Sequence, residues 1–108
     1  MSNVIETSKI FVPVESIAYA DGSVVSKTIL KKPTGNITLF AFEKGEGLAE
    51  HSSPYEALVL IVDGNAEITI GGTNHTVQNG QSIILPANIP HALKAIERFK
   101  MMLTMIKS

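Results

Sequence analysis

The chain has no cysteine among its 108 residues. This absence excludes disulfide bonds, thiolate catalysis and cysteine-ligated zinc. Long apolar runs are also missing, since the longest, residues 57–62, is far too short to span a bilayer. The first residues lack a basic region followed by an apolar one, so no secretory signal is expected. We therefore expect a cytoplasmic protein without membrane insertion.

Neither sign of charge dominates the sequence. The net charge is −1, so the chain has no general attraction for nucleic acid, and no nucleic-acid partner is expected. Hydrophobic residues make up 44% and charged residues 18%, which indicates one folded domain over residues 1–108. Between residues 57 and 93 the only acidic or basic side chains are Asp63 and Glu67. This segment should supply most of the core.

Turn-forming pairs at regular intervals separate short runs with strand character. Asp63-Gly64, Gly71-Gly72 and Asn79-Gly80 favour the positive φ angles of tight turns. Short strands with turns at this spacing indicate an all-β sandwich or barrel of antiparallel strands. The predicted strands are residues 27–32, 36–45, 57–62, 66–70, 75–77 and 82–86, with a final strand within residues 98–108.

One group of polar side chains surrounds His51. On a regular strand Ser53 and Tyr55 share its face, while Glu56 points the other way. Pro54 makes this less simple, because proline often marks an edge or a bulge, and a bulge changes which side chains face inward. The sequence leaves the orientation of Glu56 open.

Two other histidines invite opposite interpretations. His91 lies between Pro86 and Pro90 in a nearly uncharged stretch, so it is either a hydrogen-bonded core residue or a member of a site. His75 lies near a predicted hairpin, where a polar side chain is usually solvated. On the final strand, Met101 and Met105 share a face and Met102 does not, and we interpret all three as flexible core residues.

Two stretches, GEGLAEHSSPYEALVLIVDG (about 45–64) and GQSIILPANIPHALKA (about 80–95), resemble the two motifs of the cupin superfamily. In the first, Gly45, His51 and Gly64 stand at the family's spacing, whereas Ser53 and Ala57 replace a second histidine and an acid. In the second, Gly80, Pro86 and His91 fit, and Asn88 and Ala95 replace a glycine and an asparagine. The resemblance implies a small single-domain RmlC-like cupin, an antiparallel β-barrel also described as a jelly roll or double-stranded β-helix.

The resemblance also implies a metal site in which only His51 and His91 remain of four ligands. The function we favour is binding of a sugar- or carboxylate-like small molecule through His51, Ser53, Tyr55 and His91, with a degenerate metal site and no cofactor. The alternative is a metal-dependent oxygenase, decarboxylase or isomerase. It requires a divalent transition metal on His51 and His91, completed by Glu50, Glu56 or His75.

Two further functional hypotheses stay open. A metal-free epimerase-like enzyme would use His51 as base and Tyr55 as acid. A structural homodimer would form through the apolar residues 9–19, which can pair with a partner's sheet edge. A homodimer is compatible with every function above, and we expect one.

Overall fold

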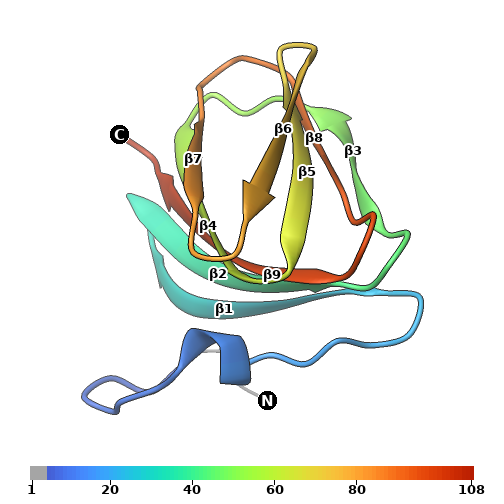
Figure 1. The fold of residues 1–108 in the computed structure, drawn as a ribbon. Helices are drawn as coiled ribbons and strands as arrows, with labels where there is room; N and C mark the ends of the chain where they lie inside the picture. Colours follow the sequence, from blue (N-terminus) through green and yellow to red (C-terminus); the bar gives the residue numbers. More distant parts are fainter. Residues whose placement is uncertain (1–4) are drawn as a thin grey trace.

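The computed structural model describes residues 5–108, which form a sandwich of β-strands closed into a barrel (Figure 1). A single 3-10 turn, η1 (Pro13–Glu15), precedes the strands. In chain order the strands are β1 (Val24–Lys32), β2 (Gly35–Phe42), β3 (Gly47–His51), β4 (Glu56–Asp63), β5 (Asn65–Ile70), β6 (Thr73–Gln78), β7 (Ser82–Leu85), β8 (His91–Lys94) and β9 (Phe99–Ile106).

The strands form two antiparallel sheets that face each other. One has five strands in the order β1-β2-β9-β4-β7, and the other has four in the order β3-β8-β5-β6. After β2 the chain repeatedly crosses between the sheets, which gives the jelly-roll arrangement visible in Figure 1. The all-β prediction and the predicted final strand are both confirmed. The short strands β3 and β8 were not among the predicted strands.

The core lies between the two sheets and follows the alternation of the strands. Val59 and Ile61 of β4 and Ile68 of β5 point inward and are fully buried. Phe42 and Phe99 stack with their ring centroids 4.5 Å apart. Most of this larger buried cluster comes from the charge-poor segment 57–93, as predicted.

The predicted turn glycines adopt the backbone conformation that the sequence suggested. Gly64, Gly71 and Gly80 have φ angles of 70°, 55° and 85°. At Gly64 a side chain would also collide with the carbonyl oxygen of Arg98, so glycine is required there on two grounds. This turn joins β4 to β5 and carries the chain from one sheet to the other.

The N-terminal segment crosses the outer face of its own five-stranded sheet. Ile17 packs there in a second apolar cluster with Ile29, Leu39 and Ala41. Tyr19 holds the segment in place, since its hydroxyl donates a hydrogen bond to Asp63 over 2.6 Å. Part of the segment predicted to reach a partner's sheet edge is thus used within the chain, whereas Ile10 is fully exposed.

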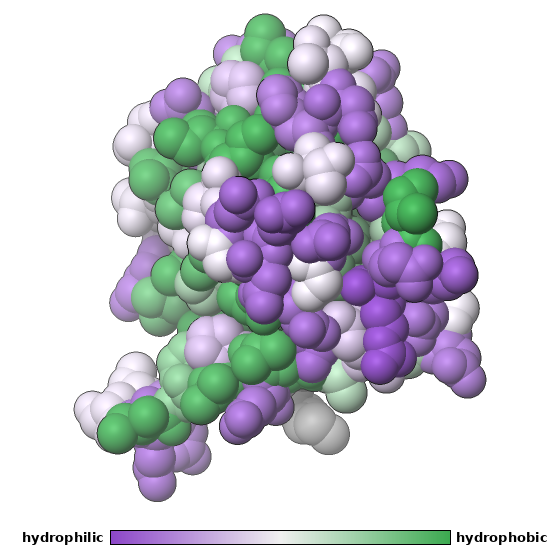
Figure 2. All heavy atoms as spheres, in the orientation of Figure 1, coloured by the Kyte–Doolittle hydropathy of each residue, from purple (hydrophilic) through white to green (hydrophobic). Residues whose placement is uncertain are grey.

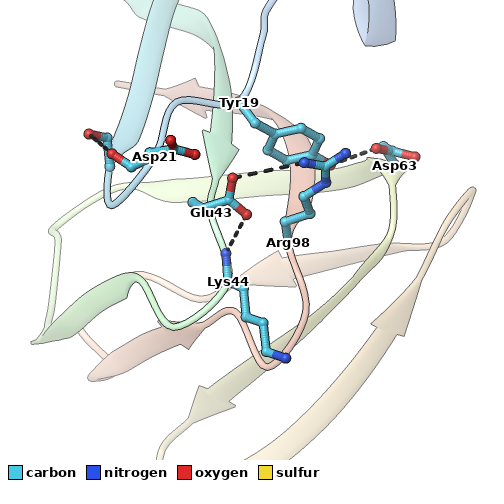
Figure 3. Close-up of polar contacts among 7 residues, drawn as sticks. Tyr19, Asp21, Glu43, Lys44, Asp63 and Arg98 are labelled. Atoms are coloured by element: carbon cyan, nitrogen blue, oxygen red, sulfur yellow. Dashed lines mark hydrogen bonds and ion pairs between the residues drawn. The ribbon is translucent and has the colours of Figure 1, made fainter.

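Charged side chains surround the Tyr19 ring. Figure 3 shows the guanidinium of Arg98 lying across it, 4.4 Å from the ring centroid, and reaching toward Glu43. Burial, together with the hydrogen bond to Asp63, raises the pKa of the Tyr19 hydroxyl. The hydroxyl therefore stays protonated and keeps donating to Asp63. Within residues 5–108 the structure contains no helix long and apolar enough to cross a membrane.

Candidate functional site

A cavity of about 130 Å³ opens between the two sheets at one end of the barrel. In Figure 1 this is the upper end, where β3 ends and β8 begins. Residues from both sheets and from the β3–β4 loop line it: Leu48, His51, Ser53, Tyr55, Ala57, Leu85, His91, Leu93, Met101, Leu103 and Met105. The lining is mostly apolar. Of its polar residues, His91 is buried, whereas His51, Ser53 and Tyr55 lie nearer to solvent.

The backbone places the two histidines side by side. His51 at the end of β3 pairs with His91 at the start of β8, after an irregularity in β3 between Leu48 and His51. Such an irregularity changes which side chains face inward. The two rings are 4.4 Å apart between centroids and meet edge to face at 67°. The cavity thus has a pair of adjacent imidazoles, one exposed and one buried.

The loops around the opening are tied to each other. The backbone amide of Asn88 donates to the carbonyl of Ser53 over 2.7 Å. Asn88 adopts a φ of 65°, which asparagine tolerates better than most residues. The hydroxyl oxygen of Ser53 also accepts a hydrogen bond from the amide of Tyr55 over 3.1 Å. These contacts connect the loop after β3, where His51 lies, to the loop before β8, where His91 lies. They help to fix the two histidines relative to each other.

His51 has a defined tautomer. Its Nδ1 lies 2.8 Å from the carbonyl oxygen of Ala49. A carbonyl oxygen can only accept, so Nδ1 carries the proton and the other nitrogen, Nε2, holds a free lone pair when the ring is neutral. The partner of His51 is a backbone carbonyl and not the carboxylate that an enzymatic base of the epimerase type would use.

His91 is buried, with only 6% of its surface exposed. Its Nδ1 is fully inaccessible and has no hydrogen-bond partner with good geometry among the described residues. Burial, followed by the proximity of His51, lowers the pKa of His91, and the backbone carbonyl of Ile89 offsets part of this. His91 is therefore neutral at neutral pH, and one of its ring nitrogens is poorly satisfied.

All four residues predicted to bind a ligand line the cavity: His51, Ser53, Tyr55 and His91. The residues considered as additional metal ligands do not line this cavity. Glu56 is exposed and directly precedes Ala57, which lines the cavity, so Glu56 faces away from it. Glu50 is exposed on β3. His75 lies on β6, where it pairs with Ile68 of β5. It is half-buried, but it lines a different hollow beside β7.

The sequence prediction missed the contribution of β9 to this cavity. Met101, Leu103 and Met105 point into it from the sheet opposite the histidines. The sequence showed that these residues alternate along one strand, but it did not show which strands lie beside β9. Met105 lies directly across from Ala57 on β4, a pairing that joins residues far apart in the chain. Where the cupin motif has an acid, this cavity has a small alanine beside a thioether.

These residues do not fit the metal site that the resemblance implies. Across residues 5–108 no three histidine, aspartate, glutamate or cysteine side chains are grouped so as to hold an ion. A divalent ion bound by nitrogen and oxygen ligands usually requires three or four of them. The pair of His51 and His91 supplies two, and we derive no reaction through such an ion.

Comparison with known proteins identifies the same family and fold. The family model for the cupin domain matches residues 38–107. A conserved protein of unknown function from Streptococcus pyogenes is 38% identical and superimposes with a TM-score of 0.91, over 96% of this chain and 91% of that one. A cupin 2 conserved barrel domain protein from Leptotrichia buccalis is 42% identical with a TM-score of 0.84, over 87% of this chain and 46% of that one.

A more distant structure has the same fold. It is a cupin superfamily protein from Desulfitobacterium hafniense, 24% identical, with a TM-score of 0.88 over 99% of this chain and 97% of that one. No curated protein matches the chain. The motif spacing, the jelly-roll topology and these matches together show that the chain belongs to the cupin family.

Proposed function

We propose that the protein binds a small organic molecule with an apolar body and a carboxylate or hydroxyl head. The observation that carries this proposal is the layout of the cavity. Leu85, Leu93 and Met101 are almost completely buried in its deep part, while His51 and Tyr55 are exposed at its open end. Binding sites for small molecules typically combine an apolar lining with a few polar groups that orient the ligand.

The size of the cavity limits the ligand. Its volume of about 130 Å³ is close to that of engineered cavities of roughly 150 Å³ that hold benzene. A body of about six non-hydrogen atoms therefore fits. A sugar ring has hydroxyls on its whole circumference, and those in the deep part would lose their hydrogen bonds to water without replacement. This favours a short aliphatic or aromatic carboxylate or alcohol over a sugar.

A screen of small ligands tests this proposal. Metal-free protein is titrated with carboxylates and alcohols of increasing chain length and with monosaccharides, and amide chemical shifts are followed by NMR. We expect saturable shifts at residues around the cavity, strongest for bodies of about six non-hydrogen atoms. Saturable shifts from sugars alone, or shifts only outside the cavity, would contradict the proposal.

A matched pair of variants locates the binding site. Ala57→Leu places a larger side chain in the cavity, whereas Ala92→Leu makes the same change on the outer face of β8. We expect the first to weaken binding at least about tenfold and the second to leave it unchanged. Equal affinities in the two variants would place the ligand elsewhere. Thermal unfolding of both variants checks that each remains folded.

We also propose that the protein is a homodimer formed through the outer face of the five-stranded sheet. Leu58 of β4 and Ile84 of β7 are paired neighbours on this face and are 44% and 60% exposed. Figure 2 shows apolar surface on the side of the molecule where β4 and β7 lie, and again on the N-terminal segment. An adjoining apolar area of this kind is typical of a protein–protein interface.

Light scattering after size-exclusion chromatography tests the dimer. The wild-type protein should elute with twice the chain mass, and Leu58→Glu combined with Ile84→Glu should give a monomer. The same two-charge change on the other sheet, Thr69→Glu with Ala92→Glu, serves as control and should remain dimeric. A monomeric wild-type protein would overturn this proposal without affecting the ligand site.

A further inference from the structure

The cavity between the sheets is lined without any permanently charged side chain. Among residues 5–108, those that line it include no lysine, arginine, aspartate or glutamate. Its polar groups are the two imidazoles and the hydroxyls of Ser53 and Tyr55. A charged head group inside the cavity would lose its water shell without meeting an opposite charge, and this is strongly unfavourable. The lining therefore favours a head group that is polar but uncharged.

His51 can meet a ligand only as a hydrogen-bond acceptor. Its Nδ1–H is already donated to the carbonyl oxygen of Ala49 over 2.8 Å, so Nε2 is the ring nitrogen left for a ligand. A neutral imidazole carries one proton, and here that proton is on Nδ1. Nε2 of His51 therefore offers a lone pair and no hydrogen.

His91 offers a lone pair as well. Its Nδ1 is inaccessible, so Nε2 is the only ring nitrogen that can reach a molecule in the cavity. The ring interacts with the backbone carbonyl of Ile89, two residues earlier, as the ring of His51 does with Ala49. A carbonyl oxygen can only accept, so the proton belongs on Nδ1, although the geometry there falls short of a well-formed hydrogen bond. Nε2 of His91 is then unprotonated.

We propose that the head group of the ligand is an uncharged hydroxyl, as in a small aromatic or aliphatic alcohol, and that it donates its hydrogen to Nε2 of His91. This inference rests on the proposed function and narrows it, because it excludes carboxylates. His91 is the buried imidazole, whereas His51 is exposed and its Nε2 can be satisfied by water. The hydroxyl oxygen of the ligand can in turn accept a hydrogen bond from Ser53 or Tyr55.

The two charged alternatives are each disfavoured for a specific reason. A carboxylate can only accept hydrogen bonds, so its oxygens would face the lone pairs of both imidazoles. An ammonium group has hydrogens to donate, but no carboxylate lines the cavity within residues 5–108 to offset its charge. A hydroxyl supplies the missing hydrogen and carries no charge that the lining would have to balance.

Three probes with the same phenyl body separate the head groups. Benzyl alcohol, benzoate and benzylammonium are titrated at pH 8, where histidine side chains are ordinarily neutral, and amide chemical shifts are followed by NMR. We expect benzyl alcohol to bind at least about tenfold more tightly than either ion. Binding of an ion as tight as that of the alcohol overturns this inference and leaves the organic-ligand function standing. If none of the carboxylates and alcohols binds, the proposed function fails, and this inference fails with it.

Two-bond proton–nitrogen NMR correlations of the histidine rings show directly which nitrogen carries the proton. We expect protonated Nδ1 in both His51 and His91 of the free protein. Benzyl alcohol should shift the Nε2 resonance of His91. His75 lines a different hollow and is the internal control, so its ring resonances should stay unchanged. A proton on Nε2 of His91 in the free protein, or equal shifts at His75, would overturn the inference.

A matched pair of lysine variants tests whether the missing positive charge is what excludes carboxylates. Ser53→Lys places an ammonium group at the cavity, and Ser52→Lys makes the same change at the neighbouring exposed residue, which does not line it. We expect benzoate binding relative to benzyl alcohol to rise about tenfold in Ser53→Lys and to stay unchanged in Ser52→Lys. Thermal unfolding checks that both variants are folded. The same ratio in the two folded variants would contradict the inference.

Discussion

Replacing His91 with phenylalanine should make the protein more stable while abolishing ligand binding. The buried Nδ1 of His91 has no well-formed partner among the described residues, and such a group destabilises a fold by about 1–3 kcal/mol. Phenylalanine keeps a planar ring in the same place without that nitrogen. Its slightly larger ring requires some adjustment of neighbours, which reduces the gain. We therefore expect a net stabilisation of about 1 kcal/mol, or a rise in Tm of about 4 °C.

Calorimetry and urea denaturation at pH 7.5, with a metal chelator present, measure this change. His51→Phe is the control, because His51 is exposed and should shift stability by less than about 0.5 kcal/mol. A loss of 1 kcal/mol or more in His91→Phe would refute the reasoning, since it would mean that an ordered water or another group satisfies Nδ1 in solution. Ligand binding in the variant is then tested by the same NMR titration.

Three other predictions follow from particular contacts. Burial lowers the pKa of His91 below its unfolded value of about 6.5, so below that pH the unfolded chain binds a proton that the folded protein does not. The free energy of unfolding of the wild-type protein should therefore fall as the pH drops below about 6.5, and it should fall less in His91→Phe. Urea denaturation at several pH values measures both. Gly64→Ala should destabilise the fold by about 2 kcal/mol or more, because of its positive φ and the collision with the Arg98 carbonyl; an unchanged Tm would contradict this. Tyr19→Phe should lose about 1 kcal/mol by removing the hydrogen bond to Asp63, and combining it with Asp63→Asn should add little further loss in a double-mutant cycle.

The sequence was a good guide to the strands and turns because their signals are local. Alternation of apolar residues and the turn glycines predicted the long strands, and the two motifs predicted that His51 and His91 belong to one site. The strands β3 and β8 were missed because each is short and contributes few apolar residues to a periodic pattern.

The remaining features of the site depend on contacts between distant parts of the chain. Met105 enters the cavity because β9 lies between β2 and β4, and its pairing with Ala57 cannot be inferred from spacing. His75 has the same parity as the inward-facing Val77, yet it belongs to a different hollow because β6 is at the far edge of its sheet from β3. The order of the strands in the two sheets, and not the residue pattern within a strand, decides whether Met105 and His75 reach the cavity.

The central position of β9 has a consequence for how the protein is made. β9 follows the other strands in chain order, yet it lies in the middle of the five-stranded sheet and pairs with both β2 and β4. During synthesis, the backbone edges of β2 and β4 that pair with β9 therefore stay unpaired until β9 is made, and the five-stranded sheet and the cavity it lines cannot be completed earlier. Changes that delay or weaken β9 should lower the yield of folded protein by aggregation, even where the finished structure tolerates them well.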